Sequence, residues 1–197
     1  MRHQQQALLP GLEEAPPLKH RLFFALVPDA EAAARLAQVS VRLRKANNLA
    51  GKAIITEHLH ITLHHLGDYP EPGVPPELLE KARAAGDSIR MPPFEVRFDG
   101  VMSFFKTANH PFVLRGKAGL ERTMAFQEAL GKAMVTTQLG HCVDARFTPH
   151  MTLTYDKRHV PEQAIEPVSW MARELVLVHS LIGQTRHIHL ARWPLRG

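Results

Sequence analysis

Two short segments of the chain combine strand-like alternation with the same three-residue motif. Residues 57–66 read EHLHITLHHL and residues 150–155 read HMTLTY, so polar and apolar side chains alternate over most of each segment. This alternation is typical of a β-strand with one buried face. Because residues two apart share a face of a strand, we expect His60 to project beside Thr62, and His150 beside Thr152. One His-x-Thr motif is weak evidence, but one in each half of the chain indicates a duplicated unit.

The surrounding sequence predicts helices that pack on strands. Apolar spacing and capping signals predict helices over residues 30–46, 76–88 and 120–137, and further strands over 21–27, 94–101, 111–115, 173–181 and 185–192. Asp29 stands where a helix N-cap belongs, and Gly183-Gln184 suits a hairpin turn. We interpret residues 67–76 and 156–172 as proline-marked loops. The predicted fold is therefore α+β with approximate internal duplication.

Composition limits the class of protein and its partners. Residues 1–19 predict a flexible tail, which leaves residues 20–197 as one domain of two lobes that share a core. The net charge of +5 and the 13 histidines favour a polyanionic partner such as RNA. Cys142 is the only cysteine, so neither an intramolecular disulfide nor a cysteine-based zinc site is possible. With neither an apolar run of about 18 residues nor a signal-peptide pattern, we expect a cytoplasmic protein without a membrane span.

The paired motifs suit phosphoester chemistry. Hydrolysis of a phosphodiester needs a base that activates water and an acid that protonates the leaving oxygen, and histidine serves in either role near neutral pH. Hydroxyls of Thr62 and Thr152 can donate to phosphate oxygens. His60 and His150 are thus candidate catalytic residues, and this chemistry requires no metal or other cofactor. The alternative is that both are structural histidines on half-buried strands.

A metal site is a further alternative on the first motif strand. His58, His60 and His64 would share one face of an extended strand, and histidines bind zinc well. Residues four apart on a strand are about 13 Å apart, which is too far for both to hold one ion. We therefore expect no functional metal, and we expect His58 and His64 to line a cleft or its rim.

Four stretches of sequence resemble one known family. RLFFAL, HLHITL, FTPHMTL and TRHIHLARWPL, which together span residues 21–195, are similar to the two-histidine phosphoesterases, and most to the RNA 2′,3′-cyclic phosphodiesterases, or bacterial 2′–5′ RNA ligases. The resemblance implies two mostly antiparallel sheets lining a central cleft, with helices outside. It implies hydrolysis of RNA 2′,3′-cyclic phosphate ends to 2′-phosphate ends, with weak reverse ligation. By the same resemblance, His60 protonates the leaving oxygen, His150 activates water, and the two threonines hold the phosphate.

The chain departs from this family at several positions. Tyr155-Asp156 stands where a basic residue is common, with Lys157 or Arg158 as the nearest substitutes. His187 replaces an aromatic residue near the final hairpin, and His58 replaces an asparagine. These departures affect the predicted substrate more than the predicted reaction.

The sequence suggests further substrate contacts and leaves other functions open. Candidate substrate contacts are His58, Phe105, Arg115 and Tyr155. We expect a monomer that acts on RNA with 2′,3′-cyclic phosphate ends. The alternatives are a phosphodiesterase for a small cyclic nucleotide or a 2′–5′ oligonucleotide, a non-catalytic RNA-binding module of the same fold, and a zinc-dependent hydrolase.

Overall fold

The computed structural model describes residues 15–116 and 118–197, so most of the predicted tail lies outside it. The helices are α1 Ala30–Ala46, α2 Pro76–Asp87 and α3 Glu121–Thr136, with short 3-10 turns η1 Thr56–His58 and η2 Gly140–Cys142. The strands are β1 His20–Leu26, β2 Ile61–Tyr69, β3 Phe94–Ser103, β4 His110–Arg115, β5 His150–Asp156, β6 Gln163–Ala172, β7 Glu174–Leu181 and β8 Arg186–Pro194.

The strands form two four-stranded antiparallel sheets with matching plans. Sheet 1 has the order β2-β1-β7-β8, and sheet 2 has the order β5-β4-β3-β6. Each His-x-Thr motif stands at the start of an edge strand, β2 in sheet 1 and β5 in sheet 2, and these two strands contact each other. The predicted α+β fold with internal duplication is confirmed.

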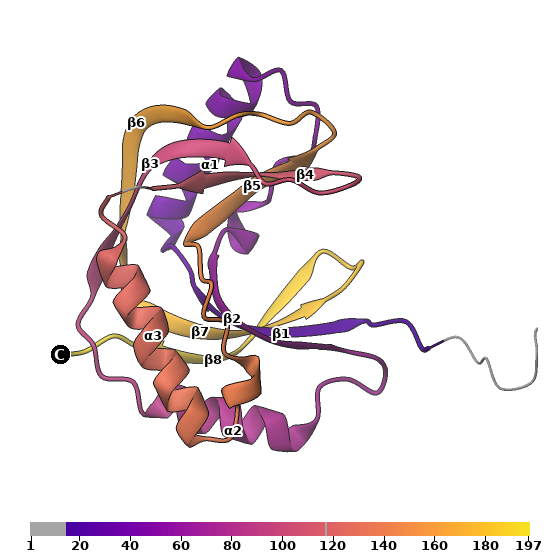
Figure 1. The fold of residues 1–197 in the computed structure, drawn as a ribbon, viewed down its shortest axis with the longest axis vertical. Coiled ribbons are helices and arrows are strands. Elements are labelled where there is room, and N and C mark those ends of the chain that lie inside the picture. The colour runs from indigo at the N-terminus through magenta and orange to yellow at the C-terminus, as the bar shows by residue number, and fades with distance from the viewer. Residues whose placement is uncertain (1–14, 117) are drawn as a thin grey trace, which may run out of the picture.

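The helices cover the outer sides of the two lobes. In Figure 1, α2 and α3 lie beneath sheet 1 in the lower half, and α1 lies with sheet 2 in the upper half. Contacts of α2 with β7 and β8, and of α3 with β2, agree with this placement. Near the end of α1, Asn47 accepts a hydrogen bond from Gln163 of β6 at 2.9 Å. The helix itself begins as predicted, because the Asp29 carboxylate accepts from the backbone N–H of Ala32 at 2.8 Å.

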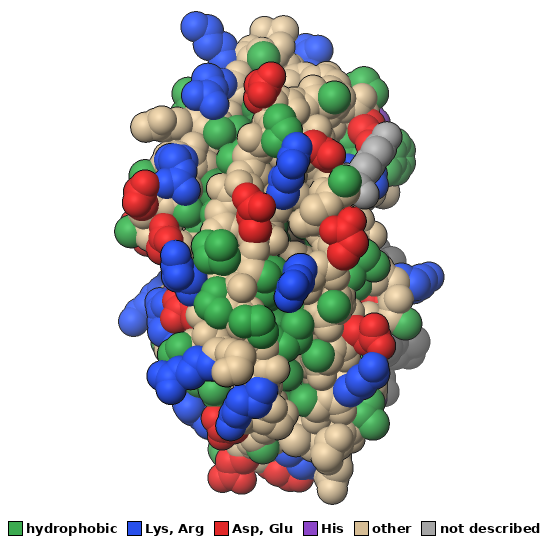
Figure 2. All heavy atoms as spheres, turned by 90° about the vertical axis from the view of Figure 1, so that its left-hand side faces the viewer, with side chains coloured by type: hydrophobic (Ala, Val, Ile, Leu, Met, Phe, Trp, Pro, Cys, Tyr) green, Lys and Arg blue, Asp and Glu red, His purple; other side chains and the backbone are tan. Residues whose placement is uncertain are grey.

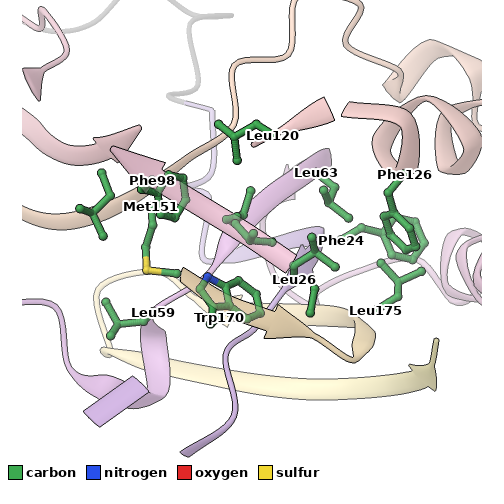
Figure 3. Close-up of a cluster of buried hydrophobic side chains, with 14 of the residues drawn as sticks. Phe24, Leu26, Leu59, Leu63, Phe98, Leu120, Phe126, Met151, Trp170 and Leu175 are labelled. Carbon is green, nitrogen blue, oxygen red and sulfur yellow. The ribbon is translucent and has the colours of Figure 1, made fainter. Parts of the chain in front are cut away.

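One hydrophobic core joins the two lobes. Phe24 of β1, Met151 of β5 and Trp170 of β6 belong to the same buried cluster, together with Phe126 of α3 (Figure 3). Each such side chain contributes about 1.5–3 kcal/mol of burial free energy. Because this core spans both sheets, the two motif strands are held in a fixed relation to each other.

Two sequence predictions about the strands are wrong. Residues 163–172, interpreted as loop, form β6; this edge strand pairs only with β3, has half of its residues exposed and contains Pro167. Edge strands accept proline and need little apolar alternation, so the usual signal is absent. The predicted bounds of the first motif strand are also wrong, because residues 56–58 form a 3-10 turn and the strand runs from Ile61 to Tyr69.

The charged residues are mixed over the side of the molecule shown in Figure 2. Basic and acidic side chains alternate across this face, which is the left-hand side of Figure 1, and almost no histidine is visible on it. The net positive charge is therefore not gathered there. In the part of the chain that the structure describes, no helix is both long and apolar enough to cross a membrane.

Candidate active site

Two β-bulges decide which side chains of β2 face the space between the sheets. Ala25 of β1 pairs with Thr62, but Phe24 pairs with His64, so Leu63 is an extra residue. The bulge turns His64 onto the core side, where it is 1% exposed and its Nε2 donates to the Gln127 carbonyl at 2.9 Å. The expectation that His64 lines the cleft is thus wrong, and its neighbour His65 faces the cleft instead.

The second motif carries a bulge at the equivalent place. Val113 of β4 pairs with Thr152 and Phe112 pairs with Thr154, so Leu153 is the extra residue. Thr154 is consequently buried and donates to the Lys52 carbonyl at 2.8 Å. Tyr155 then faces the cleft, as His65 does in the first motif.

A cavity of about 550 Å³ lies between the sheets and contains both motifs. It is lined by Arg21, Phe23, Ile54, His58, His60, Thr62, His65, His150, Thr152, Tyr155, Ser180 and His187. The structure therefore brings together the four motif residues with two further candidates, His58 and Tyr155. A cavity of this size accommodates a nucleotide-sized ligand.

Two other candidate contacts lie away from this cavity. Phe105 is 83% exposed, and its ring packs beside His110 and His159. The Arg115 guanidinium points to Met102 and lies 3.9 Å from a carboxylate oxygen of Glu162. The expected contacts of Phe105 and Arg115 with a substrate in the cleft are not supported by this placement. Lys157 and Arg158 are also absent from the described residues that line the cavity.

Both motif imidazoles are oriented by the same backbone contact. Nδ1 of His60 lies 2.7 Å from the His58 carbonyl, and Nδ1 of His150 lies 2.7 Å from the Thr148 carbonyl. Because a carbonyl can only accept, each Nδ1 carries the proton and each Nε2 is left to take or give one. In the first motif, Nε2 lies 3.1 Å from the Thr62 hydroxyl. Each His-x-Thr unit thus offers one prepared nitrogen and one hydroxyl.

Aromatic rings enclose the two imidazoles. Phe23 stacks on His60 with ring centroids 4.9 Å apart, and Phe104 meets His150 edge-on at 4.9 Å. Removal from water disfavours a charged imidazole. Burial therefore lowers the pKa of His60 from 6.5 to about 4, and it also lowers the pKa of His150. The charge of His150 is a smaller cause of the His60 shift, as expected for two cations near each other.

A pair of stacked histidines forms another wall of the cavity. The rings of His58 and His187 lie almost parallel, with centroids 3.8 Å apart, and His187 also meets His60 edge-on at 5.5 Å. Burial, followed by the charges of His58 and His60, lowers the pKa of His187 to about 3. Burial lowers the pKa of His58 as well. Both rings are therefore neutral near pH 7, which allows such close stacking.

Comparison with known proteins identifies the family. A family model described as the 2′-5′ RNA ligase superfamily matches residues 28–183. The chain belongs to this superfamily. A curated relative, the RNA 2′,3′-cyclic phosphodiesterase of Thermus thermophilus, is 29% identical over 189 residues, which cover 90% of this chain and 91% of the relative.

Solved structures share the fold of this superfamily member. The crystal structure of TT0787 of Thermus thermophilus has a TM-score of 0.69 at 25% identity, covering 90% of this chain and 98% of the other. E. coli LigT complexed with 3′-AMP has a TM-score of 0.65 at 22% identity, covering 92% and 100%. The resemblance predicted from the sequence motifs is confirmed, and so is the bilobal fold.

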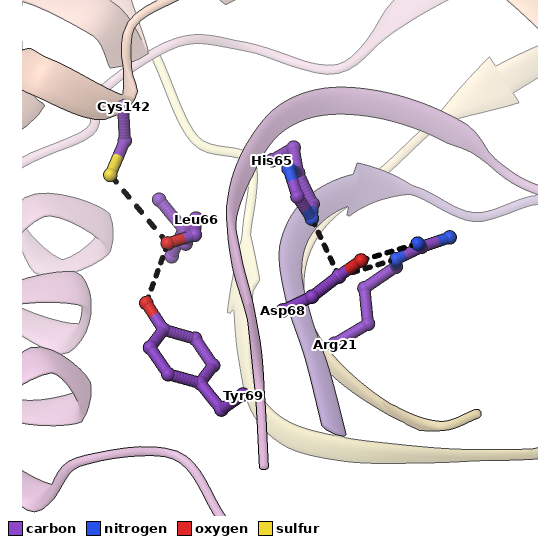
Figure 4. A network of polar contacts seen from close by, with 6 residues as sticks. All are labelled: Arg21, His65, Leu66, Asp68, Tyr69 and Cys142. Atoms are coloured by element: carbon purple, nitrogen blue, oxygen red, sulfur yellow. Dashed lines mark hydrogen bonds and ion pairs between the residues drawn. The ribbon is translucent and has the colours of Figure 1, made fainter. Parts of the chain in front are cut away.

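The sequence did not single out an ion-pair network in this superfamily member. Arg21 of β1 donates from Nε and Nη2 to the two carboxylate oxygens of Asp68 at 2.7 and 2.6 Å, and His65 donates to the same carboxylate at 2.9 Å (Figure 4). The network exists because the first bulge points His65 to the cleft, and because a second bulge at Leu66 brings Asp68, which pairs with Arg21, to the same face. The basic residue within RLFFAL was the only available signal.

The second bulge of β2 is itself held by hydrogen bonds. The Leu66 carbonyl accepts from the Tyr69 hydroxyl at 2.8 Å and from the Cys142 thiol at 3.6 Å (Figure 4). A bulged residue loses its partner in the strand ladder, so these two donors satisfy its oxygen. Burial raises the pKa of Cys142, which fits a structural thiol.

Proposed function

We propose that this chain hydrolyses RNA 2′,3′-cyclic phosphate ends to 2′-phosphate ends by acid–base catalysis with two histidines and no metal. The observation that carries the proposal is the pair of matched units in one cavity: each imidazole is fixed through Nδ1 to a carbonyl, and each is followed two residues later by a threonine. The curated relative named as an RNA 2′,3′-cyclic phosphodiesterase supports the same reaction. Binding alone would need no matched acid and base, so the arrangement favours an enzyme over a binding module.

The two imidazoles divide the proton transfers. By analogy with the family, Nε2 of His150 takes a proton from water as the water oxygen attacks phosphorus. The bond from phosphorus to the 3′ oxygen breaks, and Nε2 of His60 gives that oxygen its proton. The product carries a 2′-phosphate and a 3′-hydroxyl. Thr62 and Thr152 donate to the non-bridging oxygens, whose negative charge grows in the transition state.

The lowered pKa values bear on this assignment. Both imidazoles are neutral near pH 7, since burial disfavours their charged forms. A bound phosphodiester anion favours a charged imidazole beside it, so the substrate itself raises the pKa of the acid. Ligation, which joins a cyclic phosphate to a 5′-hydroxyl as a 2′–5′ bond, is the reverse of cleaving such a bond; the hydroxyl takes the place of water as the nucleophile, and the reaction is slow beside hydrolysis in water.

Turnover by matched histidine variants tests the proposal. An oligonucleotide with a 2′,3′-cyclic phosphate end is incubated with the wild type, His60→Ala and His150→Ala in the presence of EDTA. General acid–base catalysis contributes about 10²- to 10⁴-fold, so each variant should lose at least about 100-fold in kcat. His159→Ala, which removes an exposed imidazole beside Phe105, is the matched control and should retain full activity. Unchanged turnover in both motif variants would exclude the mechanism.

A further inference from the structure

Permanent positive charge is confined to one part of the cavity. Among the described residues that line it, Arg21 is the only lysine or arginine. Burial is the largest cause of lowered pKa values in four of the lining histidines, which are therefore mainly neutral near pH 7: His58, His60, His150 and His187. Among the described lining residues, the side of the cavity that holds Arg21 therefore offers the one permanently charged donor for an anionic ligand.

The Asp68 carboxylate orients the side chains of Arg21 and His65 at the cavity. The Asp68 carboxyl has its pKa lowered to about 2, chiefly by the hydrogen bond from Arg21. Its side chain is 20% exposed, whereas those of Arg21 and His65 are 49% and 51% exposed. The carboxylate therefore lies behind the two groups it orients. Arg21 uses Nε and one Nη2 hydrogen for Asp68, so the rest of its five N–H donors can reach a ligand.

The register of β1 and β2 sets the distance from the reacting phosphate. Ala25 pairs with Thr62, Phe23 with His65, and Arg21 with Asp68. Along β1, the pair of Phe23 and His65 is therefore two residues from the pair that contains Thr62, and the pair of Arg21 and Asp68 is four residues from it. Each step of two residues is about 7 Å. Arg21 is thus about 14 Å from Thr62 along the sheet, measured between backbones, and its long side chain brings the guanidinium into the same cavity. Tyr155 of the opposite sheet lies near Arg21 and contributes slightly to raising the pKa of that guanidinium, after the larger effect of Asp68.

We propose that Arg21, oriented by Asp68, binds the phosphate immediately upstream of the cyclic end. This inference rests on the proposed function. A 2′,3′-cyclic phosphate closes the chain at its 3′ side, so any further phosphate of the substrate must lie on the 5′ side. Arginine forms charge-assisted hydrogen bonds with phosphate, which are about twice as strong as neutral ones. The preferred substrate is then a nucleotide chain, or a nucleotide with a 5′-phosphate, over a nucleoside cyclic phosphate without one.

Two probes that differ by one phosphate test this. Adenosine 2′,3′-cyclic phosphate is compared with the same molecule carrying a 5′-phosphate, and kcat/KM is measured for each. The wild type should favour the 5′-phosphorylated probe by about 10-fold or more, since a hydrogen bond to a charged group is worth at least that factor. Arg21→Gln should bring the ratio close to one by losing activity on the phosphorylated probe alone. Arg21→Lys, which keeps the charge but loses the forked geometry, should give an intermediate ratio.

The controls separate this inference from the proposed function. Arg35→Gln removes an exposed arginine that pairs with Glu31 on α1, and it should leave the ratio unchanged. Circular dichroism establishes that the Arg21 variants are folded. If the wild type cleaves neither probe nor a cyclic-ended oligonucleotide, the proposed function fails. If it cleaves both probes equally well, or if Arg21→Gln lowers both rates by the same factor, only the upstream phosphate site is refuted.

Discussion

Phe23 controls the protonation of His60 by keeping water from one face of its ring. Phe23 is 3% exposed and stacks on His60 at 4.9 Å, and burial is the main reason that the pKa of His60 falls from 6.5 to about 4. Phe23→Ala opens that face to solvent while the edge contact of His187 stays. We expect the pKa of His60 to rise by about 1, which is less than half of its total displacement.

Phe23→Leu provides a matched control because it keeps an apolar cover over the ring. Phe23 belongs to a small cluster on the cavity side of sheet 1, apart from the main core, so the Ala variant should lose about 3 kcal/mol of unfolding free energy. Its folding is therefore checked by circular dichroism at low temperature before any titration. Phe104→Ala is the reciprocal control, since Phe104 contacts His150 and not His60.

Histidine titration by NMR measures the effect, with the His60 signal assigned by its loss in His60→Gln. The lower of the two pKa values in the pH profile of kcat/KM should rise by the same amount in Phe23→Ala, because that profile reports the pKa values of the free enzyme. A His60 pKa that stays at about 4 in Phe23→Ala, or that rises equally in Phe23→Leu, would show that Phe23 does not dehydrate the imidazole.

Three further predictions concern the pH optimum, the threonines and the bulge. Activity needs one protonated and one neutral imidazole, and both pKa values lie below 6.5, so kcat/KM should peak below pH 6.5 and fall as the pH rises; a peak above about pH 7 would contradict this. Thr62→Val and Thr152→Val should each lower kcat by about 10²-fold or more with the fold intact, and a loss confined to KM would argue against transition-state stabilisation. Tyr69→Phe removes a donor to the Leu66 carbonyl and should cost about 1 kcal/mol in urea unfolding, whereas no change would mean that the bulge does not depend on it.

The alternation of the local sequence correctly predicts which way the site residues before each bulge point. His60 and Thr62 face the cavity as alternation predicts, and so do His150 and Thr152. Beyond Thr62 the alternation fails, because the extra residue Leu63 exchanges the faces of the two histidines that follow. A bulge depends on the register with the neighbouring strand, which the alternation of a single segment does not contain.

Long-range pairing explains the other omissions. Arg21 and His187 come from β1 and β8, far from the motifs in sequence, and only the strand order of sheet 1 brings them to the same cavity. Arg115 ends a strand beside the second motif, which suggested a place in the cleft, yet its guanidinium lies against Met102 and near Glu162. Side-chain direction at a strand end is set by such neighbours more than by the strand itself.

The identity of the phosphate product tests the central claim most directly. An oligonucleotide with a 2′,3′-cyclic phosphate end, incubated with the enzyme in EDTA, is analysed by ³¹P NMR against authentic 2′- and 3′-phosphate standards. Two facing imidazoles that open the ring at the 3′ oxygen predict a single 2′-phosphate product, formed without added metal. A 3′-phosphate, a mixture of both isomers, or turnover that appears only when metal is restored would contradict the account.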